Sequence, residues 1–281
     1  MSTIVEARGL KMYFPVGRTL GGKPKKLLKA VDDVSFQIRR GEAFGLVGES
    51  GCGKSVLCKS ILRLLPQTAK IKSGKIIVDG TDITAYRERE MTALRGSLFS
   101  MVFQDPMTGT ATTMSIEENM AIAARRGKSR GLRWGITKAE REKYRQMLST
   151  LHLGLEDRLT SKVGLLSGGQ RQAITLLMAS IQKPKLLLLD EHTAALDPKT
   201  AAKVLEISDQ IISENHLTAM MVTHNMKDAI AHGNRLIMMH EGKVILNIAG
   251  EDKKKLTVGD LLHQFEKVSG EEFASDKALL S

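Results

Sequence analysis

The chain has 281 residues, 42% of them hydrophobic, which is enough to build the core of one large domain or of two small ones. Its 42 Lys and Arg against 31 Asp and Glu give a net charge of +11, which favours anionic partners such as nucleotides, nucleic acid or lipid headgroups. A basic surface that only keeps the protein soluble explains the charge equally well.

Cysteine content and the termini exclude further classes. The two cysteines, Cys52 and Cys58, fit neither a CxxC motif nor a disulfide framework, so we expect a reducing compartment. The N-terminal residues lack the apolar core of a signal peptide, and no run approaches the roughly 18 apolar residues of a membrane span. We therefore expect a soluble, cytoplasmic protein.

The first third of the chain alternates strands with turns. Strand patterns at residues 4–7 and 34–38 flank the Gly- and Lys-rich segment 16–26, which predicts an exposed hairpin connection. Residues 41–66 predict a short strand, a glycine-rich turn and a helix. Residues 73–83 predict a second hairpin that turns at Asp79 and Gly80.

Helical and strand patterns alternate in the remainder. Residues 116–153 have helical periodicity interrupted by a basic segment, residues 125–145, which contains the only tryptophan, Trp134. Buried-strand runs follow at 185–191 and 217–225, and a hairpin is expected around Glu241 and Gly242. The tail predicts an amphipathic helix from the spacing of Leu256, Leu261, Leu262, Phe265 and Val268. This order indicates an α/β fold with a largely parallel sheet edged by antiparallel hairpins.

The segment GESGCGKS, residues 48–55, matches the phosphate-binding pattern GxxxxGK[ST] between a predicted strand and a predicted helix. Glycines let backbone N–H groups surround phosphate oxygens, Lys54 bridges the β- and γ-phosphates, and Ser55 ligates Mg²⁺. Cys52 is interpreted as a small side chain tolerated in the loop. The residues expected to hold the phosphates of ATP are Gly48, Glu49, Ser50, Gly51, Cys52, Gly53, Lys54, Ser55 and Val56.

A phosphate loop also needs a carboxylate for its metal. Four leucines before Asp190 place this residue at the C-terminal end of a buried strand, where ligands bind in open α/β sheets. We expect Asp190 to hold Mg²⁺ through water and Glu191 to act as the general base or polariser of the attacking water.

The string LSGGQ, residues 166–170, supplies a second glycine-rich helix N-terminus ahead of that strand. With it, the chain resembles the nucleotide-binding subunit of ATP-binding cassette (ABC) transporters from about residue 4 to residue 250. Further motifs occur in that family's order: Gln104 in the Q-loop, Asp197 in the D-loop AALD, and a switch histidine, His224, in VTHN.

The resemblance implies a P-loop NTPase fold: a RecA-like core with an antiparallel β-subdomain, at residues 1–104 and 164–250. It also implies an inserted helical subdomain at 105–163 and a C-terminal helical cap at 251–281. Two subunits are expected to pack head to tail, as a homodimer or a heterodimer with a second ABC ATPase, around two ATP molecules.

The resemblance assigns further roles by position. The signature residues Ser167, Gly168, Gly169 and Gln170 of one subunit, with Asp197, are expected to reach the nucleotide of the other, and a helix cap is the alternative role for Ser167. His224 is expected at the γ-phosphate, and a strand-end cap is the alternative. Tyr13 is expected to stack on adenine, with Phe14 as the alternative, because one aromatic of an adjacent pair usually turns into the core.

Gln104 is expected to touch Mg²⁺ or the lytic water and to link hydrolysis to the helical subdomain, which receives a membrane permease. The basic segment 125–145 falls in this subdomain, where a solvated surface loop and a contact with the permease or lipid headgroups are both open. This implies a protein peripheral to the inner face of the membrane.

The resemblance changes character after Met107. The preceding part is similar to dipeptide and oligopeptide importer ATPases, whereas TGTATTMSIEEN, AITLLMASI and DEHTAALD depart from that branch, with His192 in place of a proline. We hypothesise a chimera joined near Gln104; drift within a less characterised branch is the alternative. No cysteine follows Cys58, so an iron–sulfur site is not expected.

The leading interpretation is an ATPase subunit that powers a separate importer, a peptide importer by resemblance. Alternatives are an engineered scaffold without a transport partner, and a soluble ABC ATPase acting on nucleic acid, which the net charge favours. The latter class carries either a long coiled coil or two cassettes, and this chain shows neither, so no nucleic-acid partner is expected.

Overall fold

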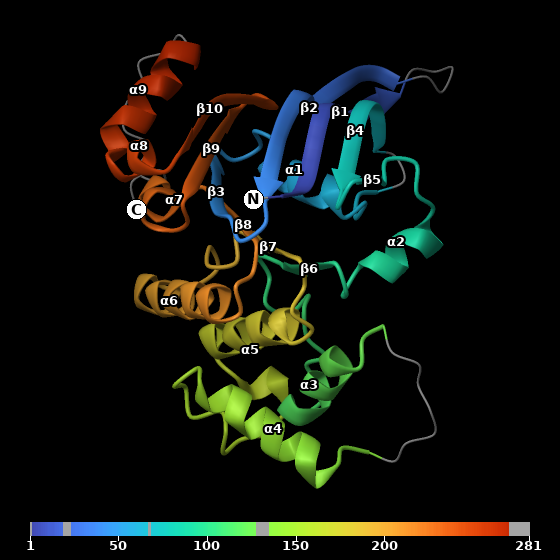
Figure 1. Ribbon diagram of the computed structural model, residues 1–281, viewed down its shortest axis with the longest axis vertical. Coiled ribbons are helices and arrows are strands. Elements are labelled where there is room, and N and C mark those ends of the chain that lie inside the picture. Colours follow the sequence, from blue (N-terminus) through green and yellow to red (C-terminus); the bar gives the residue numbers. More distant parts are fainter. Residues whose placement is uncertain (1, 19–23, 67–68, 128–134, 270–281) are drawn as a thin grey trace. The chain divides into compact units, whose positions relative to one another are not determined.

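The computed structural model describes residues 2–18, 24–66, 69–127 and 135–269. The chain divides into two compact units: unit 1 comprises Met1–Met91 and Thr218–Ser281, and unit 2 comprises Thr92–Leu217 (Figure 1). The predicted helical subdomain, residues 105–163, lies inside unit 2. The finer division of the chain into core, subdomain and cap stays a prediction.

Unit 1 contains an antiparallel sheet with the strand order β2-β1-β4-β5 (Figure 1). Its strands are β1 (Thr3–Arg18), β2 (Pro24–Arg39), β4 (Lys70–Val78) and β5 (Thr81–Asp82). The expectation of a loop over residues 16–26 was wrong at both ends, because Val16 pairs with Lys26 and Arg18 with Pro24. Backbone hydrogen bonds extend the hairpin there although its side chains lack a strand pattern.

Both predicted hairpin turns are confirmed. Asp79 and Gly80 have φ angles of 50° and 81°, and Glu241 and Gly242 have φ angles of 44° and 78°. Two successive residues in the left-handed region form the tight turn whose twist matches that of antiparallel strands.

Unit 1 also contains strands in the order β10-β9-β3-β8. Here β3 (Ala43–Gly48) runs parallel to β8 (Ala219–Thr223) and to β9 (Arg235–His240), and β10 (Lys243–Ala249) returns antiparallel to β9. Helix α1 (Lys54–Ile61) packs on β3 and β8, and α7 (Met226–Ala231) packs on β3. Helix α7 lies close to β3, since a Cβ on Gly45 of β3 would stand 3.3 Å from the carbonyl oxygen of Ala229 in α7.

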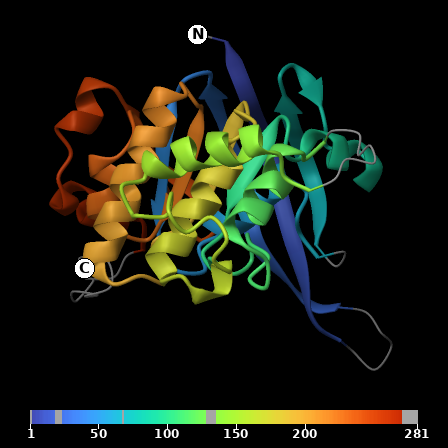
Figure 2. The ribbon, with the colours of Figure 1, turned by 90° about the horizontal axis from the view of Figure 1, so that it is seen from below.

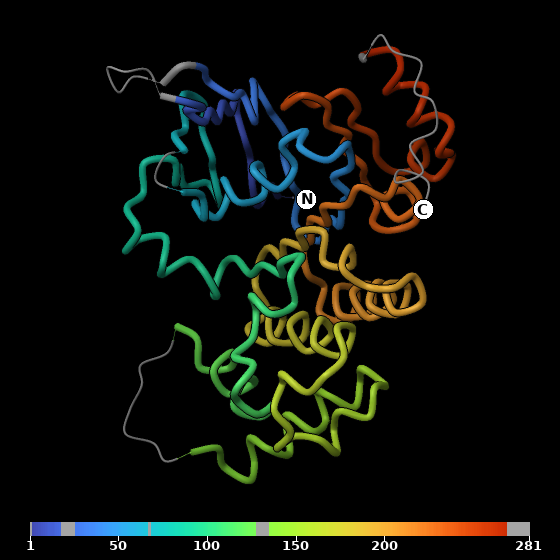
Figure 3. The backbone as a smooth tube through the Cα atoms, turned by 180° about the vertical axis from the view of Figure 1, so that it is seen from behind, coloured from blue at the N-terminus to red at the C-terminus, as the bar shows by residue number. Residues whose placement is uncertain are grey.

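The predicted tail helix is present. Helices α8 (Glu251–Lys254) and α9 (Val258–Ser269) lie against β10, and α9 also contacts α7 (Figure 3). Leu261 and Phe265 are buried in a cluster with Val47 and Met238, and Leu262 packs at its edge. Val268 is 51% exposed, so its predicted place on the buried face was wrong.

Unit 2 contains a parallel strand pair and the remaining longer helices. Strand β6 (Phe99–Val102) pairs with β7 (Leu186–Asp190). Helices α3 (Ile116–Ala124), α4 (Lys138–Ser149) and α5 (Gly168–Ser180) pack against one another, as Figure 2 shows. Helix α6 (Pro198–Glu214) packs on α5, a short 3-10 helix spans Val163–Leu165, and α2 (Glu88–Leu94) lies where the chain passes from unit 1 to unit 2.

Parts of the basic segment 125–145 are tied into unit 2. Arg125 bonds Glu140 at 2.9 Å, and Arg141 bonds the buried Glu117 of α3 at 2.5 Å. The backbone N–H of Thr137 and the Arg125 guanidinium lower the pKa of Glu140 to about 2. These two arginines therefore join α3 to α4. Trp134 lies outside the described residues.

The first prediction concerns Lys253, which is 3% exposed and donates from Nζ to the carbonyls of Ile230, His232 and Gly233 at 2.6–3.0 Å. These carbonyls lie in the last turn of α7 and directly after it, where a cation is favourable. We expect Lys253→Met to lower the free energy of unfolding by about 2 kcal/mol in urea titrations.

The matched control is the neighbouring Lys254→Met. Lys254 is exposed and pairs with the exposed Glu251, so a change below about 0.5 kcal/mol is expected. Equal effects of the two substitutions would contradict the capping role.

Candidate functional site

The loop from Gly48 to Gly53 joins β3 to α1 and closes around its own lysine. Lys54 is 4% exposed, and its Nζ donates to the carbonyls of Gly48 and Glu49, both at 2.8 Å. Its charge is thus fixed inside the loop, at the N-terminus of α1, where the helix itself favours anions.

Two glycines let this loop approach its neighbours closely. A Cβ on Gly53, which has a φ of +102°, would lie 2.0 Å from the Ala30 carbonyl oxygen, and one on Gly48 would lie 2.2 Å from that of Met239. No other residue fits these positions without moving backbone. The result is a cradle of the kind that surrounds a polyphosphate.

Cys52 packs inside this loop. Its side chain is 6% exposed, and burial raises the pKa of its thiol, while the neighbouring Lys54 charge acts in the opposite direction. The Cys52 carbonyl accepts from Gly242 of the β9–β10 turn at 3.0 Å. These contacts agree with the packing role expected for this cysteine.

His224 lies at the same edge of unit 1 as the phosphate loop. Thr223, the last residue of β8, pairs with Val47 of the parallel strand β3, so His224 and Gly48 follow at adjacent strand ends. The next residue caps α7, because the Asn225 side chain accepts from the N–H groups of Lys227 and Asp228. The strand-end cap stays the alternative role of His224. His224 is half-buried.

Tyr13 lies on β1, with its hydroxyl donating to Asp32 at 2.6 Å; this hydrogen bond raises the pKa of the phenol. The Lys29 ammonium stands 5.8 Å from the centre of its ring. Phe14 is half-buried, and Met12 occupies the core position, so the expectation that one aromatic of the pair turns into the core was wrong. The choice of Tyr13 stays a prediction.

Unit 2 has its own carboxyl edge. Val102 of β6 pairs with Leu189 of the parallel strand β7, which brings the segment after each strand to one edge. Gln104 is exposed there, and Asp190 is 3% exposed. Glu191 has a φ of +49°, a conformation that costs a residue other than glycine about 1 kcal/mol. Residues other than glycine in this conformation cluster at active sites and also occur in tight turns, as at Asp79 and Glu241.

His192 is buried in the turn between β7 and α6 and faces α6. Its Nε2 lies 2.9 Å from the Ser208 hydroxyl, which itself donates to the Val204 carbonyl at 2.7 Å. The hydroxyl has one proton, so His192 must donate from Nε2. A histidine at this position therefore attaches the end of β7 to α6 through a hydrogen bond, which a proline could not make.

The signature string forms the start of α5. Ser167 caps this helix, accepting from the Gln170 N–H, while the Gln170 side chain accepts from the Ser167 N–H at 3.2 Å. A Cβ on Gly169 would lie 2.1 Å from Thr200 Cγ2 of α6. Glycine is thus required by the packing of α5 on α6, and Ser167 does cap a helix, as its alternative reading proposed.

Asp197 caps α6 and accepts from the Thr200 N–H at 3.1 Å. Hydrogen bonds from Thr200 lower the pKa of this carboxyl. Asp197 is therefore held ionised at the helix N-terminus.

The sequence profile described as ABC transporter matches residues 31–194. The chain is 40% identical over 245 residues to the tyrosine transport ATP-binding protein of Clostridioides difficile, which covers 87% of this chain and 93% of that protein. The chain belongs to the ABC transporter ATP-binding family. It is 35% identical to the dipeptide transport ATP-binding protein DppD of Bacillus subtilis, over 87% of this chain and 70% of that protein.

The fold of this ABC ATPase agrees with solved structures. A dimeric ATP-binding cassette in a post-hydrolysis state, bound to ADP and phosphate, superposes with a TM-score of 0.73 and 25% identity, over 88% of this chain and 98% of that one. The expected P-loop NTPase fold and the expected ATPase activity are confirmed. The alignment with the tyrosine transport protein necessarily crosses Gln104, since it covers 87% of the chain.

The structure brings the predicted residues together within each unit. In unit 1 the phosphate loop and His224 share one strand edge, and in unit 2 Gln104, Asp190 and Glu191 share another. Sequence reasoning missed Gln172, a fully buried amide on the apolar face of α5. The sequence feature that could have revealed it is a glutamine at a position where the helical periodicity predicts an apolar residue. Within the described residues, no helix of this ABC ATPase has the length and apolar character of a membrane span.

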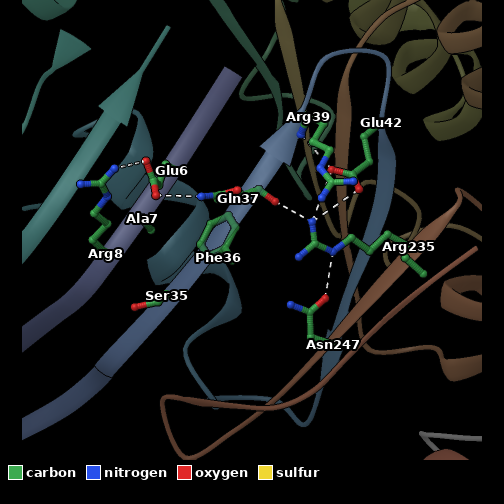
Figure 4. Close-up of a pocket in the computed structure, with 11 residues that line it drawn as sticks. Glu6, Ala7, Arg8, Ser35, Phe36, Gln37, Arg39, Glu42, Arg235 and Asn247 are labelled. Atoms are coloured by element: carbon green, nitrogen blue, oxygen red, sulfur yellow. Dashed lines mark hydrogen bonds and ion pairs between the residues drawn. The ribbon is translucent and has the colours of Figure 1, made fainter. Parts of the chain in front are cut away.

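Unit 1 also has an open pocket of about 490 Å³, lined by Glu6, Arg8, Glu42, Arg235 and Asn247 among others (Figure 4). Its charges pair with one another: Arg8 bonds Glu6 at 2.7 Å and Arg235 lies 3.4 Å from Glu42. Glu42 and Arg235 stand at the amino ends of β3 and β9. At about 3.3 Å per residue, this is roughly 16 Å from the carboxyl end of β3, so the pocket is not the phosphate site.

The second prediction concerns the loop glycines of this ABC ATPase. Gly53→Ala places a Cβ against the Ala30 carbonyl and must displace the loop, so we expect ATP to bind at least about 100-fold more weakly, a loss of roughly 3 kcal/mol. Gly51→Ala is the control. Its Cβ meets nothing within 4 Å, although its φ of +82° still costs about 1 kcal/mol.

Equilibrium titration with a fluorescent ATP analogue measures both dissociation constants. The close approach of Gly53 would be irrelevant to binding if the two substitutions weakened it equally.

Proposed function

We propose that this ABC ATPase is the ATP-hydrolysing subunit of an importer and powers a separate membrane permease. The observation that carries the proposal is its 40% identity to a tyrosine transport ATP-binding protein over 93% of that protein's length. Relatives named for dipeptide transport and for methionine import, the latter 33% identical in Oceanobacillus iheyensis, support the same class. Amino acids and short peptides are the proposed cargo class, and the permease makes the choice among them.

The residues of unit 1 bind the substrate nucleotide. The loop from Gly48 to Val56 surrounds the phosphates of ATP with N–H groups, and Lys54 places its charge on the β- and γ-phosphates. Tyr13 stacks on adenine. The adjacency of His224 to Gly48 supports a role for this histidine at the γ-phosphate.

The residues of unit 2 carry out hydrolysis. Glu191 takes the proton of the attacking water, and its fixed backbone conformation supports this assignment because a general base must be aimed. Gln104 orients the same water.

Ser55, Gln104 and Asp190 are the proposed ligands of Mg²⁺. All three offer oxygen donors, the type that this ion prefers, and it commonly takes only one or two carboxylates together with substrate phosphates. When bound, Mg²⁺ neutralises charge on the phosphates.

Two copies, or one copy and a second ABC ATPase, form a head-to-tail dimer. Ser167 and Gly168 are exposed at the N-terminus of α5, a place where backbone N–H groups and the helix dipole favour an anion. With Gly169, Gln170 and Asp197 they reach the nucleotide of the partner. The dimeric cassette with ADP and phosphate supports this arrangement.

The helical subdomain, residues 105–163, receives the permease at the inner face of the cell membrane. Gln104, at its first border, transmits closure of the dimer to it. Co-expression with candidate permeases followed by purification of the complex tests this coupling. A permease that co-purifies and accelerates ATP turnover supports it, whereas stimulation by DNA or RNA alone would favour the nucleic-acid alternative that the charge of +11 suggests.

The third prediction addresses hydrolysis. Glu191→Gln keeps the shape of the side chain and removes the proton acceptor, so we expect turnover to fall at least about 100-fold while ATP still binds and an ATP-bound dimer accumulates. Phosphate release and size-exclusion chromatography with ATP measure the two effects.

Glu214→Gln provides the control. Glu214 is an exposed carboxylate at the end of α6 that accepts from Gln210, and its substitution leaves turnover unchanged. Wild-type turnover of Glu191→Gln would refute the assignment of the general base.

A further inference from the structure

Helix α5 holds both ends of the loop that carries Gln104. At the first end, the Gln172 amide donates from Nε2 to the Phe103 carbonyl at 3.1 Å. At the other end, a Cβ on Gly109 would lie 2.4 Å from Thr175 Cγ2, so the loop backbone packs directly on that methyl group. Gln172 and Thr175 are three residues apart and share one face of the helix. The loop is therefore attached to α5 at two points.

The bond from Gln172 is the specific contribution of its amide. Gln172 is 0% exposed, and its Oε1 has no hydrogen-bond partner among the described residues. A buried acceptor without a partner is costly, and an apolar side chain of the same size would avoid that cost. The compensating contact is the one to Phe103, the residue directly before Gln104.

Between the two attachments the loop is held by its own hydrogen bonds. Asp105 accepts from the Met107 N–H at 2.9 Å, and beyond Gly109 the buried Asn119 side chain accepts from the Ala111 N–H at 2.8 Å and donates to its carbonyl at 3.0 Å. Gln104 itself is exposed at the start of the loop. Because the following residues are fixed to one another, the direction of Gln104 depends on where the Phe103 carbonyl is held.

We propose that Gln172 is a positioning residue for Gln104, tying the Q-loop to the signature helix so that the two move as one body. The inference rests on the proposed role of Gln104 in hydrolysis. Gln172 begins the second turn of the helix that Ser167 caps, and its hydrogen bond to Phe103 passes a displacement of the signature string to the residue before Gln104. Closure at the signature and orientation of the lytic water are thereby coupled within one subunit.

The test compares Gln172 with Gln182, since the side-chain amide of each donates a hydrogen bond to a backbone carbonyl. Gln172→Met keeps the length of the side chain and removes the donor; it also removes the unpartnered Oε1, so the melting temperature changes little. We expect kcat for ATP hydrolysis to fall about tenfold with KM unchanged, because a small misplacement of Gln104 slows the reaction without weakening binding.

Gln182→Met is the matched control. Gln182 follows α5 and donates to the Ala124 carbonyl, away from the Q-loop, so its loss leaves kcat unchanged. An unchanged kcat in Gln172→Met, or an equal loss in Gln182→Met, overturns the inference.

A double-mutant cycle with Gln104→Ala distinguishes the positioning role of Gln172 from the catalytic role of Gln104, on which it rests. If Gln172 acts through Gln104, Gln172→Met causes no further loss in the Gln104→Ala background. Multiplicative losses overturn the positioning role and leave the proposed function intact. Wild-type turnover in Gln104→Ala overturns the catalytic role of Gln104, and the inference with it.

The second attachment gives an independent test should Gln172→Met fail to fold. Gly109→Ala pushes the loop off Thr175, and we expect a similar loss in kcat. Adding Thr175→Ser removes the obstructing methyl group while keeping the hydroxyl that donates to the Arg171 carbonyl, and so restores turnover. Failure of this rescue contradicts the clamping of the loop by α5.

Discussion

The parallel pairing of β3 with β8 is the constraint that places the phosphate loop and His224 in unit 1 of this ABC ATPase. Parallel strands end at one edge, so the pairing of Val47 with Thr223 places the phosphate loop and His224 side by side although they are far apart in the chain. The pairing of β6 with β7 does the same for Gln104, Asp190 and Glu191 in unit 2. In both units, pairing between parallel strands brings together the residues proposed to act on ATP, and their side chains need not contact one another to be placed.

The residues proposed to act across a dimer also stabilise the fold of their own chain. Ser167 and Asp197 cap helices, and Gly169 is required where α5 packs on α6. The cap leaves the helix N-terminus exposed and oriented, which is the property that an anion-binding end needs. Their structural roles therefore support the proposed contacts with the nucleotide and do not compete with them.

Residue patterns predicted the parts of the fold that local chemistry controls. The turns at Asp79–Gly80 and Glu241–Gly242 and the helix start near residue 116 follow from neighbouring residues alone. The extension of β1 to Arg18 and the start of β2 at Pro24 did not, because backbone hydrogen bonds between two strands require no alternation of side chains. The hypothesis of a chimera joined near Gln104 stays a prediction, and separate similarity searches with residues 1–105 and 106–281 test it.

The sequence by itself determined the family, the order of its motifs and the residue types of the site, since these depend on spacing along the chain. Only the tertiary structure decided that His192 donates to Ser208, that Lys253 caps α7 and that Gln172 holds Phe103. Each of these contacts joins a buried polar group to a partner 16 or more residues away. Burial forces a polar group to find a partner, and the packing of distant elements alone determines which one it finds.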